Sequence, residues 1–338
     1  MSRTNSDREY GFVYTTEPRR SNFKTILGGF VLFLFVAIWF ASIGSPVLFY
    51  LTIQHQQYLL STLIIFLSLA AYLPWEKNEF TLKFAKFARL NLFFYKKCKY
   101  VFETKTSLAT SDHPNAATRK PLFYAIHPHG AFCLGWSMLF TSPRMRSVKF
   151  CFSPVLYISP FFRLWCRLTG NPGRADKKSM VSYMKKKIDI ALPPGGFEEA
   201  TLTSINHDRV YIKKRLGFIK LALTHGYDVV PVYSFGENLT YWNIQGQWKF
   251  RLKLNNLGLP AIFVVGNPLC PILPKRNDLG LYVACGEPLV LPIIENPSRE
   301  EVKKYHDKYI AALLKLFEEH KGNFYGEEEA KTKKLELW

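Results

Sequence analysis

The sequence lacks several patterns that would assign it to a well-defined class of protein. It has no Cys-x-x-Cys pair, and its six cysteines lie far apart, which argues against a zinc ribbon, a redox couple and a compact disulfide scaffold. No Gly-Lys-Ser/Thr follows a glycine-rich turn, so a Walker-type phosphate loop is excluded. Acidic residues are scarce, 26 against 45 lysines and arginines, and the formal charge of +19 predicts an anionic partner. The scattered cysteines are typical of free thiols in a reducing compartment.

Charge is also missing from one long segment near the N-terminus. No Asp, Glu, Lys or Arg occurs in residues 25–75, and about 20 apolar residues suffice for a helix to cross the hydrocarbon core of a bilayer. The segment is therefore long enough for two passes. The polar cluster 54–57 predicts a turn between arms at 25–53 and 58–75, with Pro46 as a kink in the first arm. We expect membrane lipids, and no nucleic acid, as partners.

Basic residues flank the outer ends of this predicted transmembrane helical hairpin, whereas its turn carries no lysine or arginine. By the positive-inside rule, both termini and the body that follows the hairpin are expected in the cytosol. A cleaved signal peptide does not fit, because its apolar region would be only about 7–15 residues long. The alternative is a buried helical pair inside a soluble domain.

Beyond the hairpin, strand-like runs alternate with helical patterns, which favours an α/β fold whose functional residues lie at the carboxyl ends of strands. The expected strands are Leu122–Ile126, Val148–Phe152, Ile188–Leu192, Asp228–Ser234, Ile262–Val265 and Leu281–Cys285, and the expected helices are Lys177–Lys187, Lys213–His225 and Arg299–Lys321. The predicted organisation is a leader (1–24), the membrane hairpin (25–75), an interfacial helix and linker (76–120), a catalytic domain (121–326) and a charged, frayed tail (327–338).

The first chemically suggestive motif is His127-Pro128-His129-Gly130, which follows an apolar strand directly. Histidine is the natural general base near neutral pH, because its unperturbed pKa is about 6.5. Gly130 would let a substrate approach the backbone closely. No third ligand with suitable spacing accompanies the two histidines, so no metal site is expected.

The second motif is a glycine-rich turn, Pro193–Glu199, which again follows an apolar strand. The N–H groups of Gly195 and Gly196 can face an oxyanion, and Glu198 or Glu199 can orient a histidine base. An ordinary turn with solvated glutamates is the alternative.

The third region begins with the basic run Lys213–Arg215, continues as a helix that stops at Gly226, and ends in a buried strand followed by Phe235–Asn238. Arg215 can meet the phosphates of a phosphorylated substrate, although a solvated face is the commoner meaning of such a run.

The order of these motifs resembles the type-2 diacylglycerol acyltransferase family, which includes monoacylglycerol and wax-ester acyltransferases. The resemblance spans residues 25–321 and includes the hairpin. It implies an acyltransferase-like mixed sheet with flanking helices, an endoplasmic reticulum membrane location with lipid droplets as a second site, and acyl-CoA as a substrate with no cofactor. It also implies that His129 is the base, supported by His127 and Glu199.

The predicted reaction is direct transfer of an acyl group from acyl-CoA to diacylglycerol, giving triacylglycerol. Gly130, Pro128, Gly195, Gly196 and Arg215 are predicted to bind substrate or the oxyanion. A monoacylglycerol or fatty-alcohol acceptor is the nearest alternative, and a noncatalytic hairpin protein of lipid droplets is the alternative from another class. A lysophospholipid acyltransferase does not fit, because no Asn-His-x-x-x-x-Asp box is present. The sequence leaves open the acceptor, the formation of homo-oligomers, and whether Glu198 or Glu199 partners His129.

Overall fold

The computed structural model describes residues 11–16, 22–75, 78–103, 106, 119–257, 261–275 and 280–338. Its centre is an eight-stranded sheet with strand order β1-β2-β11-β8-β3-β6-β4-β5. The neighbours from β8 to β5 are parallel, whereas β11 is antiparallel to β8 and β1 is antiparallel to β2. The predicted mixed α/β fold is therefore confirmed.

The strands of this sheet are β1 Phe12–Thr16, β2 Lys97–Phe102, β3 Leu122–His127, β4 Lys149–Phe152, β5 Pro172–Arg174, β6 Ile190–Leu192, β8 Asp228–Phe235 and β11 Gly280–Cys285. Two smaller pairs are β7 Asp208–Val210 with β12 Leu335–Leu337, and β9 Trp242–Asn243 with β10 Val264–Val265. The strand expected at 262–265 thus lies outside the main sheet. The helices are α1 Asn22–Ile43, α2 Ser45–Gln54, α3 Tyr58–Ala70, α4 Glu79–Ala88, α6 Leu134–Phe140, α7 Pro154–Ile158, α8 Pro160–Thr169, α9 Lys177–Lys185, α10 Gly196–Leu202, α11 Gly217–His225, α12 Trp248–Asn256, α13 Arg299–Tyr325 and α14 Glu327–Ala330, with 3₁₀ turns η2 Arg89–Phe94, η4 Pro143–Met145 and η5 Glu237–Leu239.

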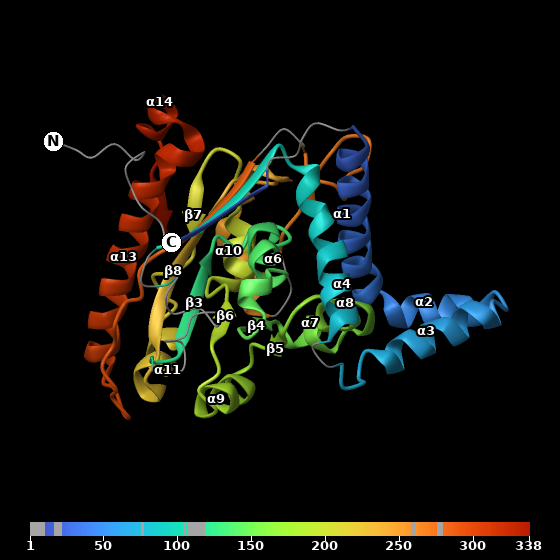
Figure 1. Cartoon of the computed structure of the whole chain (residues 1–338), viewed down its shortest axis with the longest axis horizontal. Helices are drawn as coiled ribbons and strands as arrows, with labels where there is room; N and C mark the ends of the chain where they lie inside the picture. Colours follow the sequence, from blue (N-terminus) through green and yellow to red (C-terminus); the bar gives the residue numbers. More distant parts are fainter. Residues whose placement is uncertain are drawn as a thin grey trace.

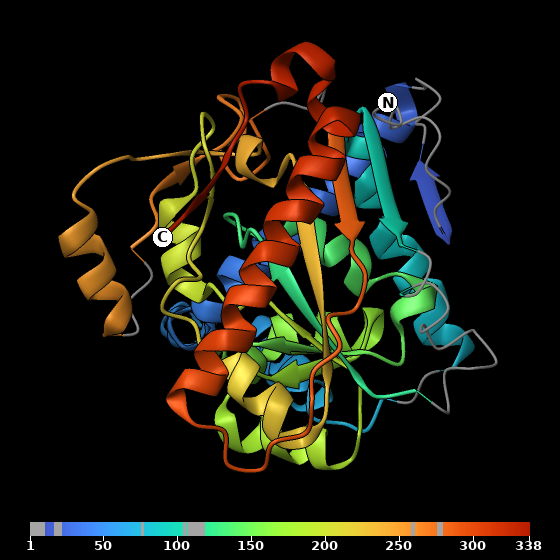
Figure 2. The ribbon, with the colours of Figure 1, turned by 90° about the vertical axis from the view of Figure 1, so that its left-hand side faces the viewer.

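Hydrophobic cores lie on both faces of the sheet. Because successive side chains of a strand point to opposite faces, the two cores take alternate residues of β3: Tyr124 and Ile126 join one, and Phe123 and Ala125 join the other. α13 and α11 cover the second face, and α13 crosses in front of the sheet in Figure 2. α1, α4, α6 and α8 lie on the first face (Figure 1). The strand ends at the centre of the sheet are therefore enclosed by helices on both sides.

The N-terminal segment differs from the predicted two-pass hairpin. The first arm breaks at Gly44, so that α1 and α2 are separate helices and Pro46 lies in the first turn of α2. Among the described residues only α1, Asn22–Ile43, is long and apolar enough to cross a membrane by length and composition. At about 1.5 Å per residue, α2 and α3 extend roughly 15–20 Å, less than the ~30 Å hydrocarbon core. Figure 1 shows them projecting together away from the α/β body.

α1 is also part of the body. One face of the helix, which includes Val31, Leu32 and Val36, is completely buried. Gly28 lies so close to η2 that a Cβ there would overlap the backbone of Phe94. A helix predicted as a membrane pass is therefore packed along one side on the α/β body.

Two other sequence expectations are corrected. Residues 97–102, assigned to the interfacial segment, form β2 inside the main sheet, so the body begins well before residue 121; most of the expected linker at 103–120 lies outside the described residues. The tail is not frayed, because β12 pairs with β7 and the Trp338 carbonyl oxygen accepts the N–H groups of Ile212 and Lys213.

Candidate active site

His127 is the last residue of β3, and its side chain is fully buried. It shares the face of Phe123 and Ala125, so its ring points toward α13 and lies 6.3 Å from the Tyr309 ring. Its Nδ1 is 3.0 Å and 2.9 Å from the two carboxylate oxygens of Glu199. Its Nε2 is buried without a hydrogen-bond partner among the described residues. His127 therefore lies below the site and supports it.

Glu199 is fully buried and receives hydrogen bonds from three residues. Besides the His127 ring, it accepts the backbone N–H of His129 at 2.7 Å and that of Tyr211 at 2.8 Å. The expectation that Glu199 pairs with the ring of His129 is therefore not met: the carboxylate holds the main chain of His129 and the ring of His127. Gly195 makes this possible, since a Cβ there would overlap the Glu199 side chain.

Of the two histidines, His129 is the one whose side chain lines a cavity. Its Nδ1 is 2.9 Å from the carbonyl oxygen of Gly130, and because a carbonyl oxygen only accepts, Nδ1 carries the proton of the neutral ring. Burial lowers the pKa of His129, although the Gly130 carbonyl and the Glu199 charge act in the opposite direction. The ring is thus neutral near pH 7, and Nε2 keeps a lone pair for an incoming proton.

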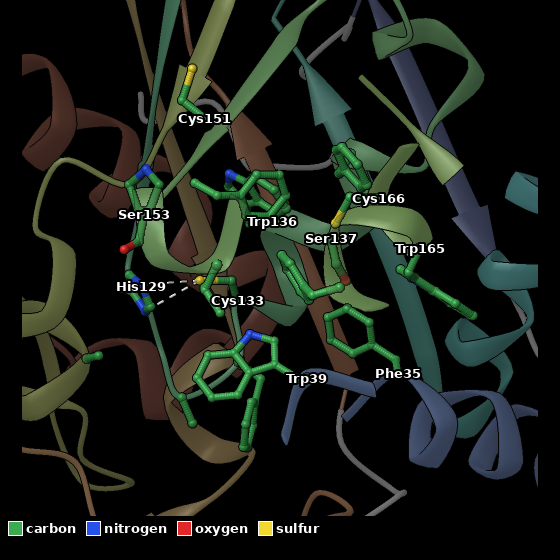
Figure 3. A pocket seen from close by; sticks show the side chains of 18 of the residues that line it. Phe35, Trp39, His129, Cys133, Trp136, Ser137, Cys151, Ser153, Trp165 and Cys166 are labelled. Carbon is green, nitrogen blue, oxygen red and sulfur yellow. Dashed lines mark hydrogen bonds between the residues drawn. The ribbon is translucent and has the colours of Figure 1, made fainter. Parts of the chain in front are cut away.

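Cys133 lies beside this ring, at the start of α6, with its Sγ 3.4 Å from Nδ1 and 3.6 Å from Nε2 of His129 (Figure 3). The sequence analysis did not predict this contact. Burial, together with the charges of Glu237 and Glu199, raises the pKa of the Cys133 thiol well above its ordinary value. A thiolate is the nucleophilic form of cysteine, so the contact does not make Cys133 an activated nucleophile.

The space in front of His129 is an apolar cavity of about 100 Å³, which we call the catalytic cavity. Nine of its 23 lining residues are Phe or Trp, including Phe35 and Trp39 from α1 and Trp136 from α6. In Figure 3, His129 lies at one side of the cavity and Trp165 of α8 at the opposite side. The apolar N-terminal helix therefore forms part of the candidate site.

Glu237 is a buried carboxylate that the sequence analysis did not place in the site. It follows Gly236 at the end of β8 and accepts the N–H groups of Leu134 at 3.0 Å and Gly135 at 2.6 Å. Burial raises the pKa of Glu237 to about 7. The carboxylate also lies against Gly130, whose φ is +62° and whose Cβ, if present, would overlap Glu237. The sequence feature that could have identified Glu237 is a glutamate close to a glycine at the end of a strand, as in the Pro193–Glu199 turn.

The other predicted residues surround the glycine turn. Arg215 forms an ion pair with Glu198 and donates to the Gly195 carbonyl at 3.2 Å. Its guanidinium also lies over the Tyr211 ring, 5.1 Å from the centroid. The N–H of Gly196 donates to the Pro193 carbonyl at 3.3 Å, and Pro128 is buried. Arg215 therefore holds the turn from outside, with part of its charge already paired.

No group of three or more His, Cys, Asp or Glu side chains that could hold a metal ion occurs in the part of the chain that the structure describes. The six cysteines, all within that part, are free thiols.

Comparison with known proteins identifies the family. Residues 52–337 match the family model described as "Diacylglycerol acyltransferase", so the chain belongs to this family. Mouse diacylglycerol O-acyltransferase 2-like protein 6 is 38% identical over 225 residues, which are 59% of this chain and 65% of that protein. Mouse 2-acylglycerol O-acyltransferase 1 is 32% identical over 230 residues (60% and 65%), and human diacylglycerol O-acyltransferase 2 is 29% identical over 232 residues (62% and 59%).

The chain thus matches less than two thirds of the length of these curated relatives. A solved structure, the 1-acyl-sn-glycerophosphate acyltransferase PlsC from Thermotoga maritima, aligns with 90% of this chain and 97% of its own, with 16% identity and a TM-score of 0.42.

Proposed function

We propose that this chain is an acyl-CoA-dependent O-acyltransferase that makes triacylglycerol from diacylglycerol, with His129 as general base. The observation that carries the proposal is the position of the His129 ring at the wall of an apolar cavity, with its Nδ1 on a carbonyl oxygen and a lone pair on Nε2, where a substrate hydroxyl would replace the Cys133 thiol that lies 3.6 Å away. An apolar cavity with few polar groups suits an acyl chain. Membership in the diacylglycerol acyltransferase family supports an acyl donor and a lipid acceptor.

The proposed reaction is a single transfer. The acceptor hydroxyl donates a hydrogen bond to Nε2 of His129, which takes the proton as the oxygen attacks the thioester carbonyl carbon. When the tetrahedral intermediate collapses, the carbon–sulfur bond breaks and the imidazolium returns the proton to the leaving sulfur. The products are a lipid ester and free CoA thiol, and His129 is neutral again.

The buried pair beneath the base has a positioning role in this scheme. Glu199 holds the His129 backbone N–H and the His127 ring, so the turn that carries the base is tied to α10. The negative charge of Glu199 also stabilises the imidazolium that forms on His129 during transfer, in agreement with its effect on the pKa of that ring. The oxyanion role predicted for the N–H groups of Gly130 and Gly195 remains part of the proposal, whereas the Gly196 N–H already donates to the Pro193 carbonyl.

The proposed location is the endoplasmic reticulum membrane, with the α/β body on the cytosolic side and lipid droplets as a second site. α1 supports a membrane location, because it is long and apolar enough to span and also lines the catalytic cavity. Monoacylglycerol is the second candidate acceptor, since a 2-acylglycerol O-acyltransferase is 32% identical to this chain.

The test is an acyl-transfer assay on microsomes from a host that makes no neutral lipid, expressing this chain. Labelled acyl-CoA is supplied, and diacylglycerol, monoacylglycerol, a fatty alcohol and retinol are offered separately. Labelled triacylglycerol from diacylglycerol is the expected product. Diacylglycerol or wax ester as the main product would keep the mechanism and change the acceptor. No product from any acceptor would refute the proposed function and favour a noncatalytic membrane protein.

A further inference from the structure

A second apolar cavity, which we call the hairpin groove, lies between the α2–α3 pair and α8. Its volume is about 370 Å³, and every side chain that lines it is aliphatic or aromatic. Leucines supply most of the wall, among them Leu48, Leu60, Leu63 and Leu67 from α2 and α3, and Leu164 and Leu168 from α8. The groove is outside the site described above, and the reaction as proposed does not use it.

Polar contacts at the end of α1 and after α3 hold the N-terminal helices on α7 and α8, so the positions of the helices that line the groove are fixed. At the end of α1, the Ser42 hydroxyl accepts the backbone N–H of Phe162 at 2.8 Å. After α3, Arg163 Nε donates to the Ala71 carbonyl at 2.9 Å, and its guanidinium lies over the Tyr72 ring at 4.3 Å. The Tyr72 hydroxyl in turn donates to the carbonyl of residue 158, at the end of α7, at 2.9 Å.

Trp165 connects the groove to the catalytic cavity, because its side chain lines both. It is only 8% exposed and packs edge-to-face on Phe84, with 5.5 Å between ring centroids. Phe35 of α1 lies 6.4 Å away on the side of the catalytic cavity. The two cavities are thus separated by one layer of aromatic rings, at the side of the catalytic cavity opposite His129 (Figure 3).

We propose that the hairpin groove binds one acyl chain of the lipid acceptor and guides this acceptor past Trp165 toward the catalytic cavity. This inference rests on the proposed function. The volume of the hairpin groove lies within the range of about 300–1,000 Å³ found for ligand sites.

The choice of the acceptor chain over the donor chain follows from where each substrate comes from. A diacylglycerol stays in the bilayer, because each methylene removed from water favours the apolar phase. Leu60 and Leu63 line the groove and are 43% and 48% exposed, and the neighbouring Leu59 is 88% exposed, so the groove opens at an apolar surface that suits lipid. Acyl-CoA carries anionic phosphates and approaches from water, where the basic residues Lys213 and Lys214 are exposed.

The binding test uses the full-length chain in nanodiscs that contain a diacylglycerol with a diazirine near the end of one acyl chain. After irradiation, adducts are mapped by mass spectrometry. We expect adducts on Leu164 and Leu168, which face the groove, in wild type and equally in His129→Ala, because binding does not need catalysis. An excess of unlabelled diacylglycerol should remove them. Adducts confined to outward residues such as Leu59, with none on α8, would overturn the proposal.

The kinetic test uses a substitution whose larger side chain fills the groove. Leu63→Trp is expected to raise the KM for diacylglycerol about tenfold, since the chain loses apolar contacts, with the KM for acyl-CoA nearly unchanged. Leu59→Trp on the outer surface of α3 is the matched control and should leave both constants unchanged. Equal effects of the two variants would contradict the groove. A chain that is labelled on α8 but transfers no acyl group would refute the proposed function, whereas one that transfers acyl groups without such labelling would refute the groove alone.

Discussion

Substitution of Glu199 by glutamine is expected to damage both stability and activity. The two carboxylate oxygens of Glu199 accept hydrogen bonds from three donors: the His127 ring, the His129 N–H and the Tyr211 N–H. A glutamine of the same shape keeps one oxygen and turns an NH₂ group toward at least one of these N–H groups. A buried donor without an acceptor costs about 1–3 kcal/mol. We therefore expect Glu199→Gln to lower the free energy of unfolding by about 2 kcal/mol.

The same change should lower kcat by about a hundredfold, because the turn that carries His129 loses its fixed position. Thermal unfolding and acyl transfer of the purified enzyme in detergent measure the two effects. The neighbouring variant Glu198→Gln is the control. Glu198 is buried, but its ion pair with Arg215 is reached by solvent on the Arg215 side, with side chains 11% and 33% accessible, so a smaller loss of stability is expected than for Glu199→Gln. If Glu199→Gln behaves like Glu198→Gln in both assays, the assigned role of Glu199 is wrong.

Three further changes test the rest of the site. Because burial raises the pKa of Glu237 from 4.5 to about 7, the stability that this group contributes is full below pH 4.5 and lost as the pH rises through 7. Glu237→Gln should remove that slope, worth roughly 3 kcal/mol, in unfolding measured at several pH values; an unchanged slope would contradict this. Cys133→Ser should keep most of the activity in the same transfer assay, because direct transfer needs no thiol, and a loss like that of a missing nucleophile would favour an acyl-enzyme. Gly195→Ala places a methyl against Glu199 and should cost about 1–3 kcal/mol of stability in thermal unfolding, with a fall in activity; a neutral result would show that the turn can move.

The fold was predictable where local pattern and burial agree. β3 and β11 lie within one residue of the expected strands, since both are apolar runs between turn residues. β2 was missed because it begins with alternating lysines, and its partner β11 lies far along the chain, so nothing local specifies the pairing. The charge-free N-terminal segment was correctly predicted to contain a helix long and apolar enough to cross a membrane. Hydropathy alone does not distinguish contact with lipid from contact with protein, and α1 has a face packed on the body.

The site was predictable as a set of motifs but not as a set of pairs. Strand alternation already puts His127 on the face of Phe123 and Ala125, and applying it would have assigned His127 to the interior and left His129 for the cavity. The pairing of Glu199 with His127 and of Glu237 with Leu134 joins segments 72 and 103 residues apart, and a single sequence does not encode those contacts. Glu237 was missed for the same reason.

The most direct test of the account is the rate of acyl transfer by His129→Ala. Among the residues that the structure describes, the His129 ring forms hydrogen bonds only with the Gly130 carbonyl and Cys133, so its loss should leave the unfolding temperature almost unchanged. A positioned general base contributes about 10²–10⁴ in rate, and the account predicts a loss in that range under single-turnover conditions. His127→Ala, which leaves the buried Glu199 without its ring partner, should lower the unfolding temperature as well. A near-normal rate in folded His129→Ala would contradict the central claim.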